Sequence, residues 1–106
     1  MSLAQRFLRW WRRQRGPLVV ERFDEVPLKL RRGVLALVGE EDAPWAAVLT
    51  CPCGCEARTE LLLVAGSETF WRLTHGPTGI TLAPSVWRTS GCRSHYFVRD
   101  SAIVWC

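Results

Sequence analysis

The sequence lacks any run of 18 apolar residues, and this absence excludes an ordinary transmembrane helix. A secretory signal is also missing, because the N-terminal stretch is rich in arginine and tryptophan and has no continuous apolar segment. Internal repeats and low-complexity tracts are absent as well. With 106 residues, of which 48% are hydrophobic and 23% charged, the chain has the composition of one globular domain. We expect it to lie in the cytoplasm, where thiols stay reduced.

Acidic residues are missing from the first 15 positions, which hold five of the 14 basic residues. The remaining nine basic residues face ten acidic residues, so the net charge of +4 becomes −1 once this segment is set aside. The bulk of the chain is therefore close to neutral, which weakens the interpretation of the whole domain as a nucleic-acid-binding protein.

One strong helical period is found, and it lies at the N-terminus. The apolar stripe consists of Leu3, Phe7, Trp10 and Trp11. This pattern predicts an amphipathic α-helix over residues 2–15, so we expect a basic helix in residues 1–17 and a β domain in residues 18–106. We expect the stripe to dock on the β domain, and the alternatives are a partner helix, a membrane surface and nucleic acid.

The rest of the chain is typical of short strands separated by turns. The expected strands cover residues 18–23, 26–32, 33–40, 45–50, 59–64, 69–74, 80–84, 96–99 and 102–106. Residues 84–91 can hold one short helical turn. Because no helices alternate with the strands, the sequence predicts a mostly β fold, as a small antiparallel sandwich or barrel-like domain.

Five cysteines are present, and four of them fall in two clusters with one histidine. The candidate metal ligands are Cys51, Cys53, Cys55, Cys92 and His95. Each cluster lies between two expected strands, so two turns can each offer ligands across a sheet. Four nitrogen or sulfur ligands in a tetrahedron are what structural Zn²⁺ requires. The sequence predicts a zinc site and leaves open which of the first three cysteines bind. Cys106 is expected to be a packing or incidental thiol.

A disulfide, an iron–sulfur centre and free thiols fit the cysteine pattern less well than zinc does. A disulfide within C-x-C would be strained, and a Rieske-type cluster needs a histidine in both turns. The motifs H-E-x-x-H, H-x-E with P-C-x-x-C, and the lysine-bearing phosphate loop are all absent. A nucleophilic dyad of Cys92 and His95 is explained better as metal ligation. We find no complete catalytic set, so no residue is assigned a catalytic role and an enzyme is not favoured.

The motifs LTCPCGC, ITLAPSVW and CRSHYFVRDSAIVW resemble those of an uncharacterised family of small bacterial proteins. That family is found beside genes for bacterial ubiquitin-like conjugation in defence-type islands. The resemblance implies a small zinc-bearing β domain, and it carries over the same five metal candidates. Ser94 and Tyr96 also match the family motif, without an assigned role.

We therefore predict a zinc-stabilised protein-interaction module, an accessory or adaptor protein of a bacterial ubiquitin-like conjugation system. Its expected partners are the protein components of that system. The alternative is a nucleic-acid or membrane-surface binding protein that uses the Arg/Trp-rich helix. The tryptophans of the β region, Trp45, Trp71, Trp87 and Trp105, are expected to anchor the core, and an aromatic binding platform is the alternative.

Overall fold

The computed structural model describes residues 13, 16–66, 69–89 and 91–106, and these residues form eight β-strands. The strands are β1 (Val19–Phe23), β2 (Val34–Glu40), β3 (Ala43–Thr50), β4 (Arg58–Leu62), β5 (Arg72–Gly76), β6 (Gly79–Trp87), β7 (His95–Arg99) and β8 (Ala102–Trp105). The expected mostly β class is confirmed, because the elements of the described residues are all strands. The helix expected over residues 2–15 lies outside the described residues, apart from Arg13. In the described part of the chain, no helix is long and apolar enough to cross a membrane.

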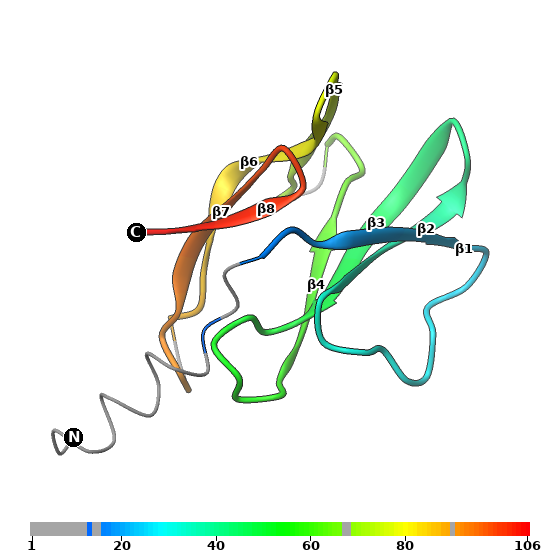
Figure 1. Ribbon diagram of the computed structural model, residues 1–106. Helices are drawn as coiled ribbons and strands as arrows, with labels where there is room; N and C mark the ends of the chain where they lie inside the picture. Colours follow the sequence, from blue (N-terminus) through cyan, green and yellow to red (C-terminus); the bar gives the residue numbers. More distant parts are fainter. Residues whose placement is uncertain (1–12, 14–15, 67–68, 90) are drawn as a thin grey trace, which may run out of the picture.

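The strands form two four-stranded sheets, ordered β1-β2-β3-β4 and β5-β6-β7-β8 (Figure 1). All neighbouring strands are antiparallel except β1 and β2, which run parallel. Three connections, β2–β3, β5–β6 and β7–β8, are two-residue turns between sequence neighbours, as the alternation of strands and turns in the sequence predicts. The parallel pair instead needs the longer crossover of residues 24–33.

The strand expected over residues 26–32 is wrong, because this crossover holds no strand. Pro27 has no amide hydrogen to donate to a sheet, and the side chain of Leu28 is 97% exposed. Val26 and Leu30 instead pack on the outer face of the first sheet, where they cover a second small core. This second core consists of Ala36, Val38, Ala46 and Val48.

The helical turn considered for residues 84–91 is also wrong, since β6 continues to Trp87. The burial pattern of β6 alternates, with Leu82 and Val86 buried. The pairing register with β7 shifts between these two residues, and the Ala83–Pro84 peptide bond in this stretch is cis. The proline is therefore accommodated at an irregularity of the strand without the strand being ended.

The main core lies between the two sheets. Its largest fully buried side chains are Tyr96, Leu35, Leu37, Leu49, Leu61 and Leu82. These residues come from both sheets, so each sheet covers the apolar face of the other. Burial of each such side chain contributes about 1.5–3 kcal/mol to folding.

The two sheets are also joined along their edges. The amide of Trp71 donates to the carbonyl oxygen of Leu62 over 2.8 Å, which connects the start of β5 to the end of β4. The amide of Leu18 donates to the carbonyl oxygen of Ser101 over 2.6 Å, which connects the start of β1 to the β7–β8 turn. These contacts give the two-sheet fold a barrel-like closure.

Candidate functional site

Three of the five metal candidates lie on the loop between β3 and β4. The amide of Cys51 donates to the carbonyl oxygen of Ala57 over 2.7 Å, and this bond closes the loop. Gly54 at its tip has a φ of 93°, a conformation that glycine adopts without steric cost, and its amide bonds back to the carbonyl of Cys51. The loop therefore holds three cysteines in a tight turn.

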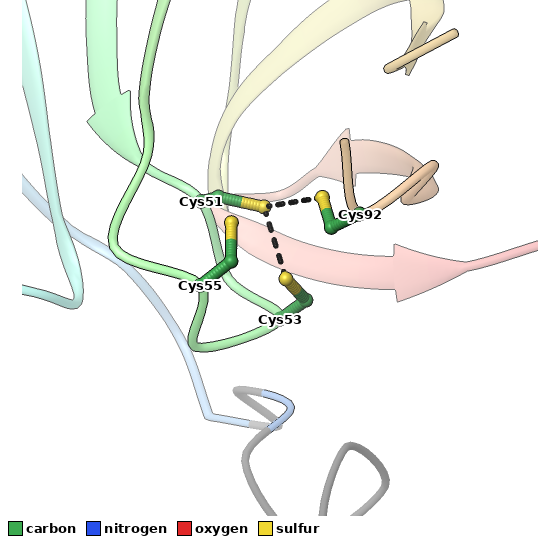
Figure 2. A group of neighbouring side chains, drawn as sticks. All are labelled: Cys51, Cys53, Cys55 and Cys92. Atoms are coloured by element: carbon green, nitrogen blue, oxygen red, sulfur yellow. Dashed lines mark hydrogen bonds between the residues drawn. The ribbon is translucent and has the colours of Figure 1, made fainter. Parts of the chain in front are cut away.

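Cys92 reaches the same place from the loop between β6 and β7. The four sulfur atoms of Cys51, Cys53, Cys55 and Cys92 all lie within 4.8 Å of one another. The Sγ atom of Cys51 lies 3.4 Å from that of Cys53 and 3.7 Å from that of Cys92. Figure 2 shows the four side chains pointing toward a common centre. We call these four residues the thiol cluster.

The dimensions of the thiol cluster fit a tetrahedral metal site. Metal–sulfur bonds of about 2.3 Å place the sulfurs of a tetrahedron about 3.8 Å apart, close to the separations from Cys51. None of the five cysteines of the chain forms a disulfide. The thiol cluster could therefore hold a metal ion, as the two sequence clusters predict.

Burial and hydrogen bonding affect the thiols in opposite directions. Burial raises the pKa of Cys51 and, less strongly, that of Cys55. Burial also acts to raise the pKa of Cys92, but hydrogen bonds from Ser94 and the neighbouring thiols outweigh it and lower the pKa to about 6. Hydrogen bonding therefore favours the thiolate form of Cys92, whereas burial favours the thiol form of Cys51.

The thiol cluster also joins the two sheets. Three of its cysteines follow β3 of the first sheet, and Cys92 precedes β7 of the second sheet. Two arginines reinforce this end of the fold: Arg88 donates to Thr59 Oγ1 over 3.2 Å, and Arg32 donates to the carbonyl of Pro52 over 3.1 Å. A metal bound here would hold the ends of both sheets together.

The structure does not bring His95 into the thiol cluster. Ser94 and Tyr96, its neighbours in sequence, are only 5% and 0% exposed and point inward. Because side chains alternate along a strand, His95 lies on the opposite, outer face of the second sheet. There its Nε2 atom lies 2.8 Å from Ser85 Oγ.

Ser85 comes from β6, where it lies beside buried Val86 and therefore on the outer face. Ser85 and His95 are both half-buried, so neither is sealed from solvent. Ser85 falls within the stretch in which the register of β6 and β7 shifts. We call these two residues the Ser–His pair.

Two aromatic rings lie next to the imidazole of the pair. The indole of Trp87 stacks on it, with ring centroids 5.2 Å apart and an interplanar angle of 20°. Phe97 lies at a centroid distance of 6.5 Å and is tilted by 32°. With a 64% exposed side chain, Trp87 is not the core anchor that the sequence predicts. Trp71 and Trp105 do pack against the main core.

The Ser–His pair has the arrangement of a nucleophile and its base. In serine hydrolases a histidine Nε2 at hydrogen-bond distance takes the hydroxyl proton as the oxygen attacks a carbonyl. Sequence reasoning missed Ser85 and assigned His95 to the metal. A signal that could have pointed to the pair was the presence of both residues in the motifs ITLAPSVW and CRSHYFVRDSAIVW.

The remaining histidine and cysteine lie apart from these two sites. His75 is exposed on β5, and Cys106 is exposed after β8. Neither belongs to the group of residues that could hold a metal.

Among known proteins, no curated protein and no solved structure matches the chain. The model of one family matches residues 22–106, which include the thiol cluster and the Ser–His pair, and its description is "Bacterial ubiquitination-like system serine protease (BubE)". The match bears out the predicted link to a bacterial ubiquitin-like system and names an enzyme class that the sequence did not favour. The chain belongs to the BubE family of bacterial ubiquitination-like systems.

Proposed function

We propose that this chain is a serine hydrolase in which Ser85 is the nucleophile and His95 the general base. The observation that carries the proposal is the 2.8 Å distance between Ser85 Oγ and His95 Nε2. This is the nitrogen and the separation that proton transfer from a serine hydroxyl requires. The family description, which names a serine protease, supports the same reaction class.

The reaction follows from these two side chains. As the Ser85 oxygen bonds to the carbonyl carbon of the scissile amide, its proton moves to Nε2 of His95. The resulting imidazolium then gives this proton to the departing amine as the C–N bond breaks, which leaves an acyl group on Ser85. Water next attacks the ester carbonyl and passes its proton to His95. The acid product leaves as Ser85 recovers a proton from the imidazolium.

The position of the pair supports a macromolecular substrate. Ser85 and His95 lie half-exposed on the face of a sheet, where an extended protein segment can reach them. Membership of a ubiquitination-like system supports protein conjugates as the substrate class. The proposed bonds are therefore peptide or isopeptide bonds formed by the ubiquitin-like protein of that system.

The test uses the metal-loaded full chain, a fluorophosphonate probe and a ubiquitin-like protein of the same system joined through its C terminus to a reporter. Ser85→Ala should abolish labelling of the serine and reduce cleavage by at least about 10⁴-fold. His95→Gln should reduce cleavage to a similar extent, because Ser85 then has no base. His75→Gln, the matched control on β5, should cleave like the wild type. A folded wild-type chain that neither labels nor cleaves contradicts the proposal.

We also propose that the thiol cluster binds one structural Zn²⁺ through Cys51, Cys53, Cys55 and Cys92. Four thiolates form a closed donor set, with no position left for a substrate. Elemental analysis should find one zinc per chain in the wild type and in His95→Gln. Chains purified under reducing conditions without zinc, or with the absorption of an iron–sulfur centre, would contradict this assignment.

The second candidate is the zinc-stabilised interaction module, an adaptor within the same system. The observation in its favour is the exposure of Trp87 (64%) and Val104 (39%) on the outer face that also carries Phe97. An apolar face of this kind suits contact with a protein partner. A wild-type chain that binds the ubiquitin-like protein with unchanged affinity after Ser85→Ala, and cleaves nothing, would favour the module.

A further inference from the structure

The Ser–His pair has no third polar member among the described residues. In a catalytic triad a carboxylate bonds to Nδ1 of the histidine and holds the ring in the orientation that points Nε2 at the nucleophile. Here the side-chain hydrogen bond of His95 is the one with Ser85, and no carboxylate in the described part of the chain bonds to the ring. The orientation of the imidazole therefore depends on other contacts.

The closest ring contact of His95 is with Trp87. The two residues are register partners on β6 and β7, so their side chains stand side by side on the outer face. Their rings are nearly parallel, at 20°, with centroids 5.2 Å apart. Rotation of the imidazole out of this plane would drive its edge toward the indole. Phe97, two residues along the same strand, is farther away and tilted, and the guanidinium of Arg99 lies 4.5 Å from its ring centroid.

We propose that Trp87 is a positioning residue that orients the imidazole of His95, as the carboxylate does in a catalytic triad. This inference rests on the proposed function of Ser85 and His95. The indole face fixes the plane of the imidazole, so that Nε2 stays directed at Ser85 Oγ. The same π face favours a cation against it, and the imidazolium that forms when Ser85 loses its proton is such a cation. Trp87 thus acts through His95 and does not react itself.

The exposure of Trp87 makes this proposal testable without loss of the fold. With 64% of its surface exposed, the side chain contributes little to the core, and substitution should leave the melting temperature and zinc content close to those of the wild type. Trp45, which is 42% exposed on β3 of the other sheet, offers a matched control.

The experiment compares Trp87→Leu, Trp87→Phe and Trp45→Leu with the wild type. It measures kcat and KM for the reporter fusion and the second-order rate of Ser85 phosphonylation by a small fluorophosphonate. Trp87→Leu should lower kcat and the phosphonylation rate together by about 10- to 100-fold, with KM within about twofold, because small misplacements of a reacting group have effects of this size. Trp87→Phe should recover most of both rates, since it keeps an aromatic face. Trp45→Leu should react like the wild type.

Three results would overturn the inference while the proposed function stands. One is a phosphonylation rate in Trp87→Leu equal to that of the wild type. Another is a rise in KM alone, which would make Trp87 a contact for the protein substrate. A Phe variant as slow as the Leu variant would also contradict the role of an aromatic face. If the wild-type chain itself fails to react with the probe, the proposed function and this inference are both overturned.

Discussion

The thiol cluster and the Ser–His pair lie on opposite faces of the same sheet end, and they differ in burial. Cys51 and Cys53 are 0% and 4% exposed, whereas Ser85 and His95 are half-buried on the outer face. One short segment contributes residues to both sites. Cys92 and Ser94 contact each other on the inner side, and His95, the next residue, points outward. The alternation of a strand that begins at His95 places the thiol cluster and the Ser–His pair on opposite faces within four residues.

The comparison indicates a division of roles. The buried cluster joins the ends of both sheets, so a bound metal would contribute to folding stability. The outer pair contributes little to packing and keeps the hydroxyl of Ser85, the proposed nucleophile, accessible. Substitutions in the cluster should therefore change stability first, and substitutions in the pair should change reactivity alone.

The largest expected effect follows from Cys51→Ser. This residue is fully buried and its sulfur contacts two others of the cluster, so its loss should release the metal. Structural zinc sites have apparent binding energies of about 10–16 kcal/mol, which is comparable to the entire stability of a small domain. We expect the melting temperature to fall by about 20 °C or more. Calorimetry checks this, with exposed Cys106→Ser as the matched control that should melt like the wild type.

The second largest effect is expected from metal removal, which should change the reactivity of the Ser–His pair as well as the thiol cluster. A chelator should lower hydrolysis and the phosphonylation of Ser85 in parallel, because Cys92 anchors the loop that leads into His95. Adding zinc back should restore both activities. A chain that keeps its full reactivity after complete loss of metal, measured on the same sample, would show that the two sites are independent.

The pH dependence of thiol alkylation in the chelated chain tests whether the pKa of Cys92 is lowered. At 4 °C, where we expect the metal-free chain to remain folded, alkylation of Cys92 by iodoacetamide should have its midpoint near the pKa of about 6 instead of the ordinary 9.0. Because the folded pKa is depressed, the stabilisation from this thiolate is complete above pH 9 and is lost as the pH falls through 6.

Peptide mapping by mass spectrometry identifies the alkylated residue. In Ser94→Ala, which lacks the hydroxyl 3.2 Å from Cys92 Sγ, the midpoint should move upward. A midpoint near 9 in the folded, metal-free wild type would show that the hydrogen bonds of Ser94 do not act on this thiol.

The smallest effect on stability and zinc content is expected for His95→Gln. If His95 acts only on the outer face, the zinc content should remain unchanged and the free energy of unfolding should change by no more than about 0.5 kcal/mol. Cys92→Ser, three residues earlier, should lose zinc under the same conditions. Loss of zinc from His95→Gln would return this histidine to the ligand set that the sequence predicts.

Much of the fold could be predicted from local patterns. Turn residues and β-branched runs indicated every strand except β5 and β6 to within two residues, because these signals act between near neighbours. The error at residues 26–32 has a tertiary cause, since Val26 and Leu30 cover the back of the first sheet from a segment without strand hydrogen bonds. The basic helix over residues 2–15 and the division of the chain after residue 17 stay predictions.

The sequence by itself determined that the chain is a small β domain and that Cys51, Cys53, Cys55 and Cys92 are ligand candidates, because strand alternation and closely spaced thiols are local properties. Only the tertiary structure decided which way His95 points and that Ser85 meets it. The two residues belong to different strands, and their contact depends on how β6 pairs with β7. A register is the outcome of packing both faces of a sheet at once, and no short motif encodes it.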